Sequence, residues 1–231
     1  MLVYRKPPWK IKDALFVLIL LVAAGYGFSL FLKWVRPPLP LSSQFLLVGL
    51  VQAAAVLGGL HYVVRVKYGG SLVQLGLTGY RLGRAFFLGV AGGTALFILV
   101  ILAGALLQNF LPDPAPQPFA ELVRGARNFR DLLVPLFLGA LLAPVTEELY
   151  FRGFLYPLLK ARYGLLAGQV LSSLVFALLH FDWLRLLPLA MGGWGLAYLY
   201  ERSGSLITAV VAHGTWNTIM ILLIYLSLHL A

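Results

Sequence analysis

Two adjacent glutamates, Glu147 and Glu148, interrupt a long apolar stretch of this 231-residue chain. A charged side chain at membrane depth costs at least about 2.5–3.5 kcal/mol, so it normally has a partner and a function. On a helix, Glu148 and Arg152 are i and i+4 and can form an ion pair. Glu147 lies about 100° around the helix from Glu148 and is left to face something else. The spacing therefore predicts one paired and one reactive carboxylate, the alternative being two acids that mark a helix end at the membrane surface.

Two further apolar segments carry a histidine each. His180 ends the sequence Phe176-Ala-Leu-Leu-His, where Phe176 shares its helical face, and His213 stands one helical turn before Asn217 in His-Gly-Thr-Trp-Asn. At i and i+4, the His213 imidazole and the Asn217 amide project together. Each of these groups alone could be a residue at the membrane surface or a hydrogen bond between helices. Their occurrence on separate helices, together with the glutamates, predicts a common site.

Glu147, His180 and His213 could hydrolyse a carbonyl bond by either of two routes. A carboxylate and two imidazoles can bind Zn²⁺ with a water in the fourth position, which lowers the pKa of that water to about 7. Without a metal, Glu147 and His180 can act as the general base for water. His213 and Asn217 would then donate hydrogen bonds to the tetrahedral oxyanion. The sequence leaves both routes open.

The composition excludes an ordinary soluble protein. Hydrophobic residues make up 61% of the chain and charged residues 11%, with a mean hydropathy of +0.89, whereas a soluble domain carries about 25% charged residues. The net charge of +10 comes from short basic clusters between long apolar runs, a pattern that sets membrane topology and predicts no nucleic-acid partner. The absence of cysteine excludes disulfides, thiolate metal sites and cysteine nucleophiles.

The candidate catalytic glutamates and histidines must therefore be positioned by membrane helices. A bilayer core about 30 Å thick needs about 20 apolar residues per helix. We expect an all-α, polytopic transmembrane helix bundle of about seven helices, or six to eight if one segment is re-entrant or lies on the surface. The expected segments are Ala14–Leu32, Gln44–Val64, Ala85–Leu111, Leu132–Thr146 extended through Leu149–Leu159, Leu165–Phe181, Leu186–Tyr200 and Leu206–His229.

Two connections interrupt the apolar runs. Residues 71–84 contain glycines and basic residues and predict a short surface helix with a turn. Residues 109–131 contain four prolines, which forbid a continuous helix, and then an amphipathic stretch at 119–129. We expect residues 1–131 to form N-terminal membrane helices and loops, and residues 132–231 to form the catalytic helix core, within one integrated membrane domain.

The basic residues predict an orientation. With the N-terminus in the cytoplasm, twelve Lys and Arg residues lie on the inner side and six on the outer side. The first apolar run is followed by Lys33-Trp-Val-Arg-Pro-Pro, without a small-residue cleavage site, so we expect a retained helix rather than a signal peptide. Because Arg152 lies on the inner flank, we expect Glu147, His180 and His213 to meet in a cavity that opens toward the cytoplasm.

The three motifs together resemble those of the CAAX-protease and bacteriocin-processing (CPBP, or Abi) family of intramembrane proteases. The resemblance rests on Glu147-Glu148-x-x-x-Arg152, Phe176-x-x-x-His180 and His213-x-x-x-Asn217 and covers about residues 132–225. It implies that Glu147 and His180 activate the water and that Glu148 pairs with Arg152. It also implies that His213 and Asn217 stabilise the oxyanion or, for His213, help to bind a metal. Zinc-dependent and metal-free glutamate mechanisms are both compatible with it.

The predicted function is thus an intramembrane endopeptidase, a hydrolase that cleaves a peptide bond near the membrane, with CAAX-type prenyl-protein activity as one form. Its partners would be the lipid bilayer and a peptide or protein substrate, with or without a lipid anchor, in a prokaryotic inner membrane. The first alternative is a non-catalytic immunity or scaffold protein of the same fold. The second is a proton-coupled transporter, although the chain lacks the repeat symmetry common in such proteins.

Overall fold

The computed structural model describes residues 7–77, 81–110, 112 and 117–229, and this part of the chain is helical without strands. Each of the seven apolar segments coincides with a helix or a continuous helical run, which confirms the predicted all-α class. The bounds are α1 (Ile11–Val35), α2 (Leu41–His61) with η1 (Tyr62–Lys67), α3 (Leu82–Gln108), the run Phe129–Tyr163, α8 (Leu165–Leu178), α9 (Leu186–Ser203) and α10 (Leu206–His229).

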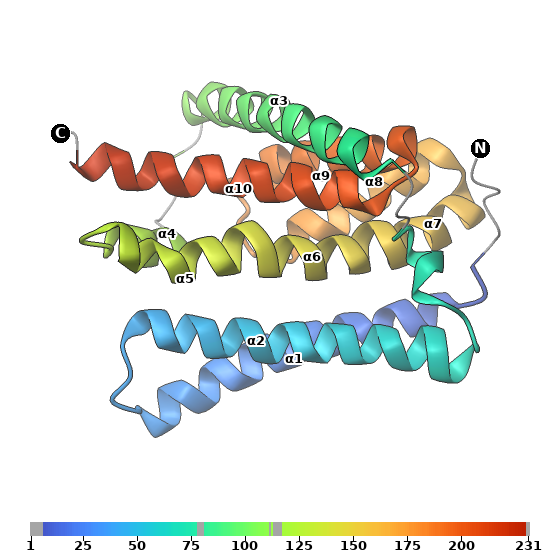
Figure 1. Cartoon of the computed structure of the whole chain (residues 1–231), viewed down its shortest axis with the longest axis horizontal. Coiled ribbons are helices and arrows are strands. Elements are labelled where there is room, and N and C mark those ends of the chain that lie inside the picture. The colour runs from blue at the N-terminus through green and yellow to red at the C-terminus, as the bar shows by residue number, and fades with distance from the viewer. Residues whose placement is uncertain (1–6, 78–80, 111, 113–116, 230–231) are drawn as a thin grey trace.

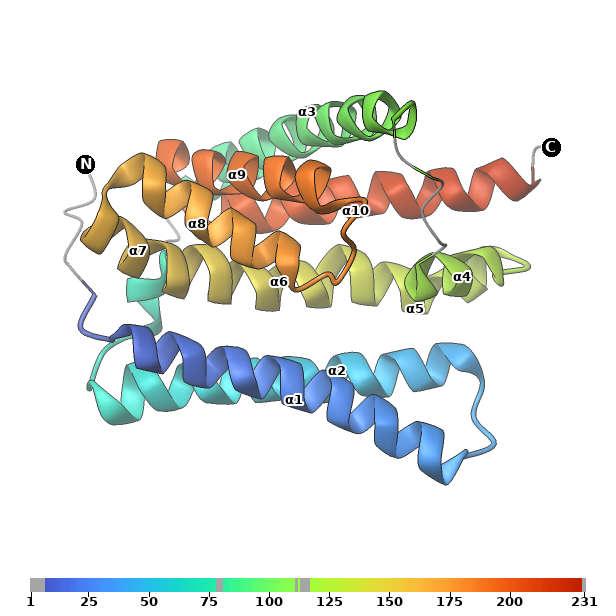
Figure 2. The same cartoon turned by 180° about the vertical axis from the view of Figure 1, so that it is seen from behind.

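Five of these helical runs are long and apolar enough to cross a membrane: 11–35, 41–67, 82–108, 129–163 and 206–228. The other two, α8 and α9, are shorter. At 1.5 Å per residue, the 14 residues of α8 span about 21 Å, less than the hydrocarbon core of a bilayer. The chain is an integral membrane protein in which α8 and α9 form a short hairpin (Figure 2).

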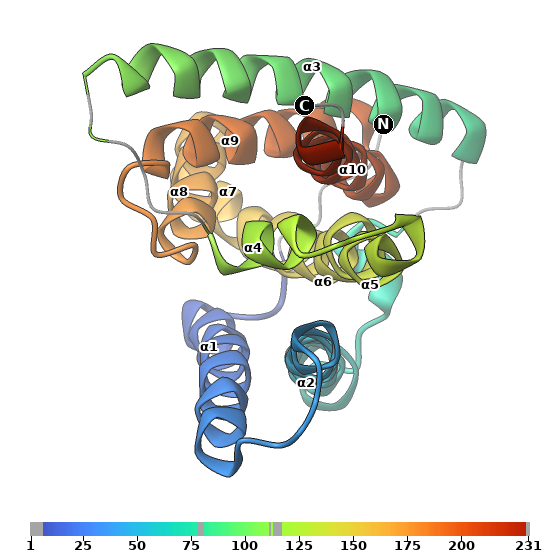
Figure 3. The same ribbon diagram turned by 90° about the vertical axis from the view of Figure 1, so that its left-hand side faces the viewer.

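The helices are arranged around two central elements, α10 and the run Phe129–Tyr163, which lie side by side (Figure 1). α3 packs along the outer side of α10, and α1 and α2 form a separate pair on the opposite side (Figure 3). α8 and α9 cover the remaining side of the central elements. The N-terminal end of the described chain and the start of α10 lie at one end of the bundle, and the C-terminal end lies at the other.

The central run Phe129–Tyr163 is not a uniform α-helix. It is built from η3 (Phe129–Leu132), α5 (Leu133–Leu136), η4 (Phe137–Leu142), α6 (Ala143–Glu148), η5 (Leu149–Leu155) and α7 (Tyr156–Tyr163), of which η4 and η5 are π-helical. π-helical turns widen the backbone spiral and are frequent at functional sites. Both glutamates of the first motif therefore lie on a short α-helical segment between two π-helical segments.

Small residues allow α3 and α10 to approach closely. A Cβ atom added at Gly93 would lie 2.3 Å from the backbone oxygen of Ala212. Small residues at helix contacts are the usual device for close packing in membranes, where no hydrophobic effect drives helices together. This contact fixes the position of α10 immediately before His213.

The two predicted connections contain short helices. Residues 72–75 form the 3₁₀ turn η2 (Leu72–Leu75), and the amphipathic stretch forms α4 (Pro118–Arg124), with Pro118 in its first turn. Residues 78–80, 111 and 113–116 of these connections lie outside the described residues. One buried apolar cluster joins residues of α1 and α2 with residues 149–159. The division between N-terminal membrane helices (residues 1–131) and a catalytic helix core (residues 132–231) stays a prediction.

Candidate active site

The second glutamate of the pair is completely buried and bonded to Arg152. The Arg152 Nη1 donates to Glu148 Oε1 at 2.8 Å, and both side chains have an exposed fraction of 0%. Removing one partner of such a buried ion pair destabilises the fold, because the remaining charge would be left without compensation in a low-dielectric interior. The i, i+4 pairing expected from the sequence is therefore present in the structure.

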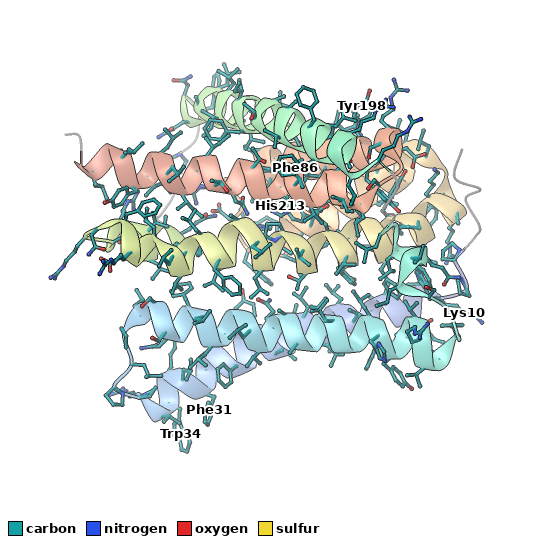
Figure 4. The ribbon with its side chains drawn as sticks, viewed as in Figure 1. Lys10, Phe31, Trp34, Phe86, Tyr198 and His213 are labelled. Carbon is teal, nitrogen blue, oxygen red and sulfur yellow. The ribbon has the colours of Figure 1, made fainter. Side chains whose placement is uncertain are left out.

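Glu148 also bonds to His213 on α10. Its Oε1 atom lies 2.9 Å from His213 Nδ1, and the His213 side chain is only 5% exposed. An ionised carboxylate can only accept a hydrogen bond, so Nδ1 carries the proton in this contact. The second ring nitrogen, Nε2, then faces away from Glu148. Glu148 thus links the first motif to the third and orients the His213 ring, which lies between α10 and the central run (Figure 4).

Arg152 holds a third element in the same network. Its Nη2 donates to the backbone oxygen of Gly193 on α9 at 2.8 Å, and its guanidinium lies 4.7 Å from the centre of the Phe176 ring of α8. A guanidinium over an aromatic face is stabilised by the ring quadrupole, more strongly when both are desolvated. Arg152 therefore joins the central run to both helices of the α8–α9 hairpin.

The first glutamate lies in different surroundings. The Glu147 side chain is 28% exposed and lines a large cavity, and its Oε2 lies 3.9 Å from His213 Nε2. Nε2 is the nitrogen that Glu148 leaves free, so an imidazole nitrogen and a carboxylate oxygen face each other. Among the described residues that line the cavity are Glu147 and His180 but not His213, so the expected meeting of all three groups in one cavity needs correction for His213. The expectation that Glu147 faces away from the Arg152 pair agrees with this geometry.

His180 lies just beyond the end of α8, in the turn that follows Leu178. Its Nδ1 lies 2.9 Å from the backbone oxygen of Phe176, which only accepts hydrogen bonds, so Nδ1 is again the protonated nitrogen. His180 lines the same cavity as Glu147. The Phe176 ring lies 4.8 Å from the His180 ring and 5.8 Å from the His213 ring, between the two histidines.

Asn217 also lines the cavity, but it does not bond to His213. Its Nδ2 donates to the backbone oxygen of Gly139 at 2.7 Å, within the π-helical segment η4. Gly214 makes this approach possible, because a Cβ atom there would lie 2.5 Å from the backbone oxygen of Ala140. His213 and Asn217 therefore project toward the same helical run, but each has its own partner on it instead of the other.

The cavity that these residues share has a volume of about 1210 Å³ and is mainly apolar. It extends to residues of α4 and of the C-terminal end of α3, including Gln108 and Arg124. These elements lie at the end of the bundle opposite the described N-terminal end (Figure 1). The expectation of a cavity on the Arg152 flank needs correction in this respect, since the lining runs from Glu147 toward the other end. The side of the membrane on which either end lies stays a prediction.

A polar cluster holds the α8–α9 loop at the far part of the cavity. Asp182 Oδ2 accepts a hydrogen bond from Gln117 Nε2 at 3.2 Å and a short one from the Arg185 guanidinium. Burial raises the pKa of Asp182, but the hydrogen bonds from Arg185 outweigh it, and the pKa lies below its ordinary value. The ionised carboxylate thus ties the loop after His180 to the start of α4.

The residues expected as metal ligands are only partly brought together. Glu147 and His213 approach each other, but the described residues contain no group of three or more His, Asp or Glu side chains arranged to hold a metal ion. As they lie, Glu147, His180 and His213 do not form the set that tetrahedral zinc requires. The presence of zinc stays a prediction.

Some contacts at this site could not be found from the sequence motifs. The backbone oxygens of Gly139 and Gly193 serve as acceptors for Asn217 and Arg152. Carbonyl positions depend on how the helices pack, which residue types do not reveal. The aromatic residue Phe176 contacts Arg152, His180 and His213, although its spacing indicated only the contact with His180.

Comparison with known proteins shows a similarity over the segment that carries this site. Residues 129–219 match the family described as type II CAAX prenyl endopeptidase Rce1-like. A 24.3 kDa protein of Escherichia coli, described as uncharacterized, is 30% identical over 122 residues, which cover 51% of this chain and 56% of that protein. A Bacillus subtilis (strain 168) protein with the provisional name membrane peptidase YdiL is 27% identical over 92 residues, covering 39% of this chain and 38% of that protein.

This chain thus matches between about two fifths and just over half of the length of these curated relatives. No solved structure gives a significant match. The segment that matches the family contains all three motifs, from Glu147 to Asn217. The comparisons confirm, over residues 129–219, the resemblance of this chain to the CAAX-protease family of intramembrane proteases.

Proposed function

We propose that this protein is an intramembrane endopeptidase that hydrolyses a peptide bond inside its helix bundle. The observation that carries this proposal is the convergence of Glu147, His180 and Asn217, from three separate elements, on one large and mainly apolar cavity. A carboxylate at the wall of an apolar cavity can act as the general base that takes a proton from water. Its electrostatic interactions are stronger there than in bulk solvent, because the local dielectric constant is lower. The family match over residues 129–219 supports the same activity.

In the proposed reaction, Glu147 takes a proton from a water molecule, and the oxygen of that water attacks the peptide carbonyl carbon. His180 assists from the same cavity through Nε2, the nitrogen that its bond to the Phe176 carbonyl leaves free. The carbonyl double bond opens to a tetrahedral oxyanion. When it closes again, the C–N bond breaks, and the leaving amine receives the proton that was taken from water.

Asn217 and His213 are the proposed groups for the oxyanion. Asn217 lines the cavity, and its amide is held by the Gly139 carbonyl, so its orientation is fixed before substrate arrives. Because Glu148 engages His213 Nδ1, a hydrogen bond from His213 to the oxyanion must come from Nε2 and requires a proton on both nitrogens. Preorganised donors of this kind stabilise developing charge without a cost of reorganisation.

The proposed substrate is a peptide with a prenylated CAAX terminus, as the name of the matching family indicates. The apolar part of the cavity can accommodate a lipid chain beside the peptide. We expect purified protein in detergent to cleave a prenylated CAAX peptide at one bond, identified by mass spectrometry, and to cleave the unprenylated peptide more slowly. If neither peptide nor a panel of membrane peptides is cleaved, a scaffold role replaces the protease.

A further inference from the structure

Most polar side chains in the cavity beyond the proposed catalytic groups already have partners. The Thr146 hydroxyl donates to backbone oxygens of its own helix, and Gln117 donates to Asp182. Arg124 forms an ion pair with Glu121. In a mainly apolar cavity, a polar atom that has no partner in the protein is an atom available to a ligand.

Gln52 has such an atom. It lies in the membrane-spanning part of α2 and lines the same cavity as Glu147. Its Nε2 donates a long hydrogen bond of 3.4 Å to the backbone oxygen of Leu21 on α1. Gly25 leaves room for the amide, since a Cβ atom there would lie 3.0 Å from Nε2. A carbonyl only accepts hydrogen bonds, so the amide nitrogen must face α1. The Oε1 atom has no hydrogen bond within the described chain.

A peptide that enters this cavity brings backbone N–H groups that need acceptors. Water supplies these acceptors in solution, but a mainly apolar cavity within a membrane protein does not. α2 packs against the segment that carries Glu147, so Gln52 and Glu147 lie on neighbouring walls of the cavity. A glutamine oxygen on one wall can bind a peptide N–H while the carboxylate on the other acts on a nearby carbonyl.

We propose that Gln52 is a substrate-binding residue, whose Oε1 accepts a hydrogen bond from a backbone N–H of the peptide next to the scissile bond. This proposal rests on the proposed endopeptidase function. It assigns to α2, which lies outside the segment that matches the family, a part in recognising the substrate. The recognised feature is the peptide backbone, so the contact is independent of side-chain sequence.

The test uses Gln52→Met, which keeps the length of the side chain and removes the acceptor, with Gln52→Leu as a second variant. Gln44→Met is the matched control, because Gln44 lies on the same helix, bonds to the Leu39 carbonyl and is not part of the cavity wall. We expect both Gln52 variants to raise KM by about 3- to 10-fold, the effect of one neutral hydrogen bond, with kcat within about 2-fold. The control should leave both constants unchanged.

A set of substrates methylated at one backbone nitrogen at a time separates binding from a structural role. In the wild type, methylation at one position should raise KM about as much as Gln52→Met does. In the Gln52→Met variant, the same methylation should add almost nothing, because the hydrogen bond is already lost. Thermal unfolding of each variant in detergent reports any loss of the α1–α2 contact separately.

An unchanged KM in both Gln52 variants overturns the proposal. So does a methylation effect of equal size in the wild type and the variant at every position, since Gln52 would then act only on the packing of α1 and α2. Failure of the wild type to cleave any peptide would instead contradict the endopeptidase function itself. The two failures are distinguished by the wild-type rate.

Discussion

Glu147 and Glu148 are neighbours in the chain, yet their side chains lie in different surroundings. Glu148 is fully buried and shares one oxygen between Arg152 and His213, whereas Glu147 is 28% exposed at the cavity wall. The other carboxylate oxygen of Glu148, Oε2, is buried without a hydrogen-bond partner in the described part of the chain. The first glutamate is therefore available for chemistry, and the second serves the structure of the site.

Replacing Glu148 should reduce stability as well as activity. Glu148→Gln removes the charge that compensates Arg152, and breaking a fully buried pair costs about 3–5 kcal/mol. Unfolding of the purified variant in mixed micelles, followed by circular dichroism, measures this loss. Glu147→Gln is the comparison and should unfold nearly as the wild type does. Equal destabilisation of the two variants would contradict the division between them.

Substitutions of His213 and of Asn217 are expected to affect metal binding differently. If zinc is bound through Glu147, His180 and His213, His213→Ala should lose metal and activity together, and Asn217→Ala should keep the metal. Asn217→Ala should still lower the rate by about 10²–10³-fold, the usual effect of losing an oxyanion donor. The test measures the metal content and the cleavage rate of each purified variant.

Without a metal, the two variants should lose similar factors in rate, and a chelator should leave the wild type unchanged. About one equivalent of zinc that follows activity through both variants would contradict the metal-free reaction described above. An Asn217→Ala variant with the wild-type rate would remove Asn217 from the oxyanion site under either mechanism.

At the scale of helices, the site depends on how closely α10 approaches the π-helical segment η4. Gly214 allows this approach, and Gly214→Ala would place a Cβ atom 2.5 Å from the Ala140 carbonyl oxygen. Because the neighbour is backbone, the helices must move apart, which typically costs about 1–3 kcal/mol. We expect lower thermal stability in detergent and a large loss of cleavage, since His213 and Asn217 move with α10.

Gly58→Ala on α2 is the control for this variant. A Cβ atom at Gly58 meets nothing within 4 Å, and alanine has the higher helix propensity, so stability should stay the same or rise. Gly214→Ala gains the same propensity. If it proves as stable and active as Gly58→Ala, the close approach is not what positions the third motif.

The sequence predicts where the membrane helices lie better than it predicts the backbone geometry within them. Apolar runs of the length of Leu206–His229 indicate membrane helices because bilayer thickness fixes that length. The π-helical turns of the run 129–163 leave no such signal, and they decide which carbonyl faces Asn217. The early end of α8 at Leu178, which puts His180 in a turn, depends on how the hairpin packs.

The motifs also predict the site residues better than their contacts. The Glu148–Arg152 pair follows from i, i+4 spacing along one helix. The bond from Glu148 to His213 joins positions 65 residues apart and depends on the packing of α10, so no local pattern indicates it. The same reason explains why His213 and Asn217 have separate partners rather than a shared one.

For the whole molecule, the cavity determines what the site can act on. It is bounded by α2, α3, α10 and the central run, so it requires elements from both halves of the chain. Near Glu147 the cavity is lined by a carboxylate and an imidazole, and the rest of the lining is mainly apolar. The polar side chains of Arg124 and Gln117 line its part toward α4. This arrangement suits an amphiphilic peptide, part of which stays in an apolar environment while one bond reaches the glutamate.

The role of Glu147 is tested most directly by the cleavage rate of Glu147→Gln on a prenylated CAAX peptide under single-turnover conditions. The substitution keeps the shape of the side chain and removes the base, so we expect the rate to fall by about 10²–10⁴-fold, with unfolding like that of the wild type. Glu121→Gln is the control, because Glu121 forms an exposed ion pair on α4, and it should cleave at the wild-type rate. A folded Glu147→Gln variant that cleaves within a few-fold of the wild type would show that Glu147 does not activate the water.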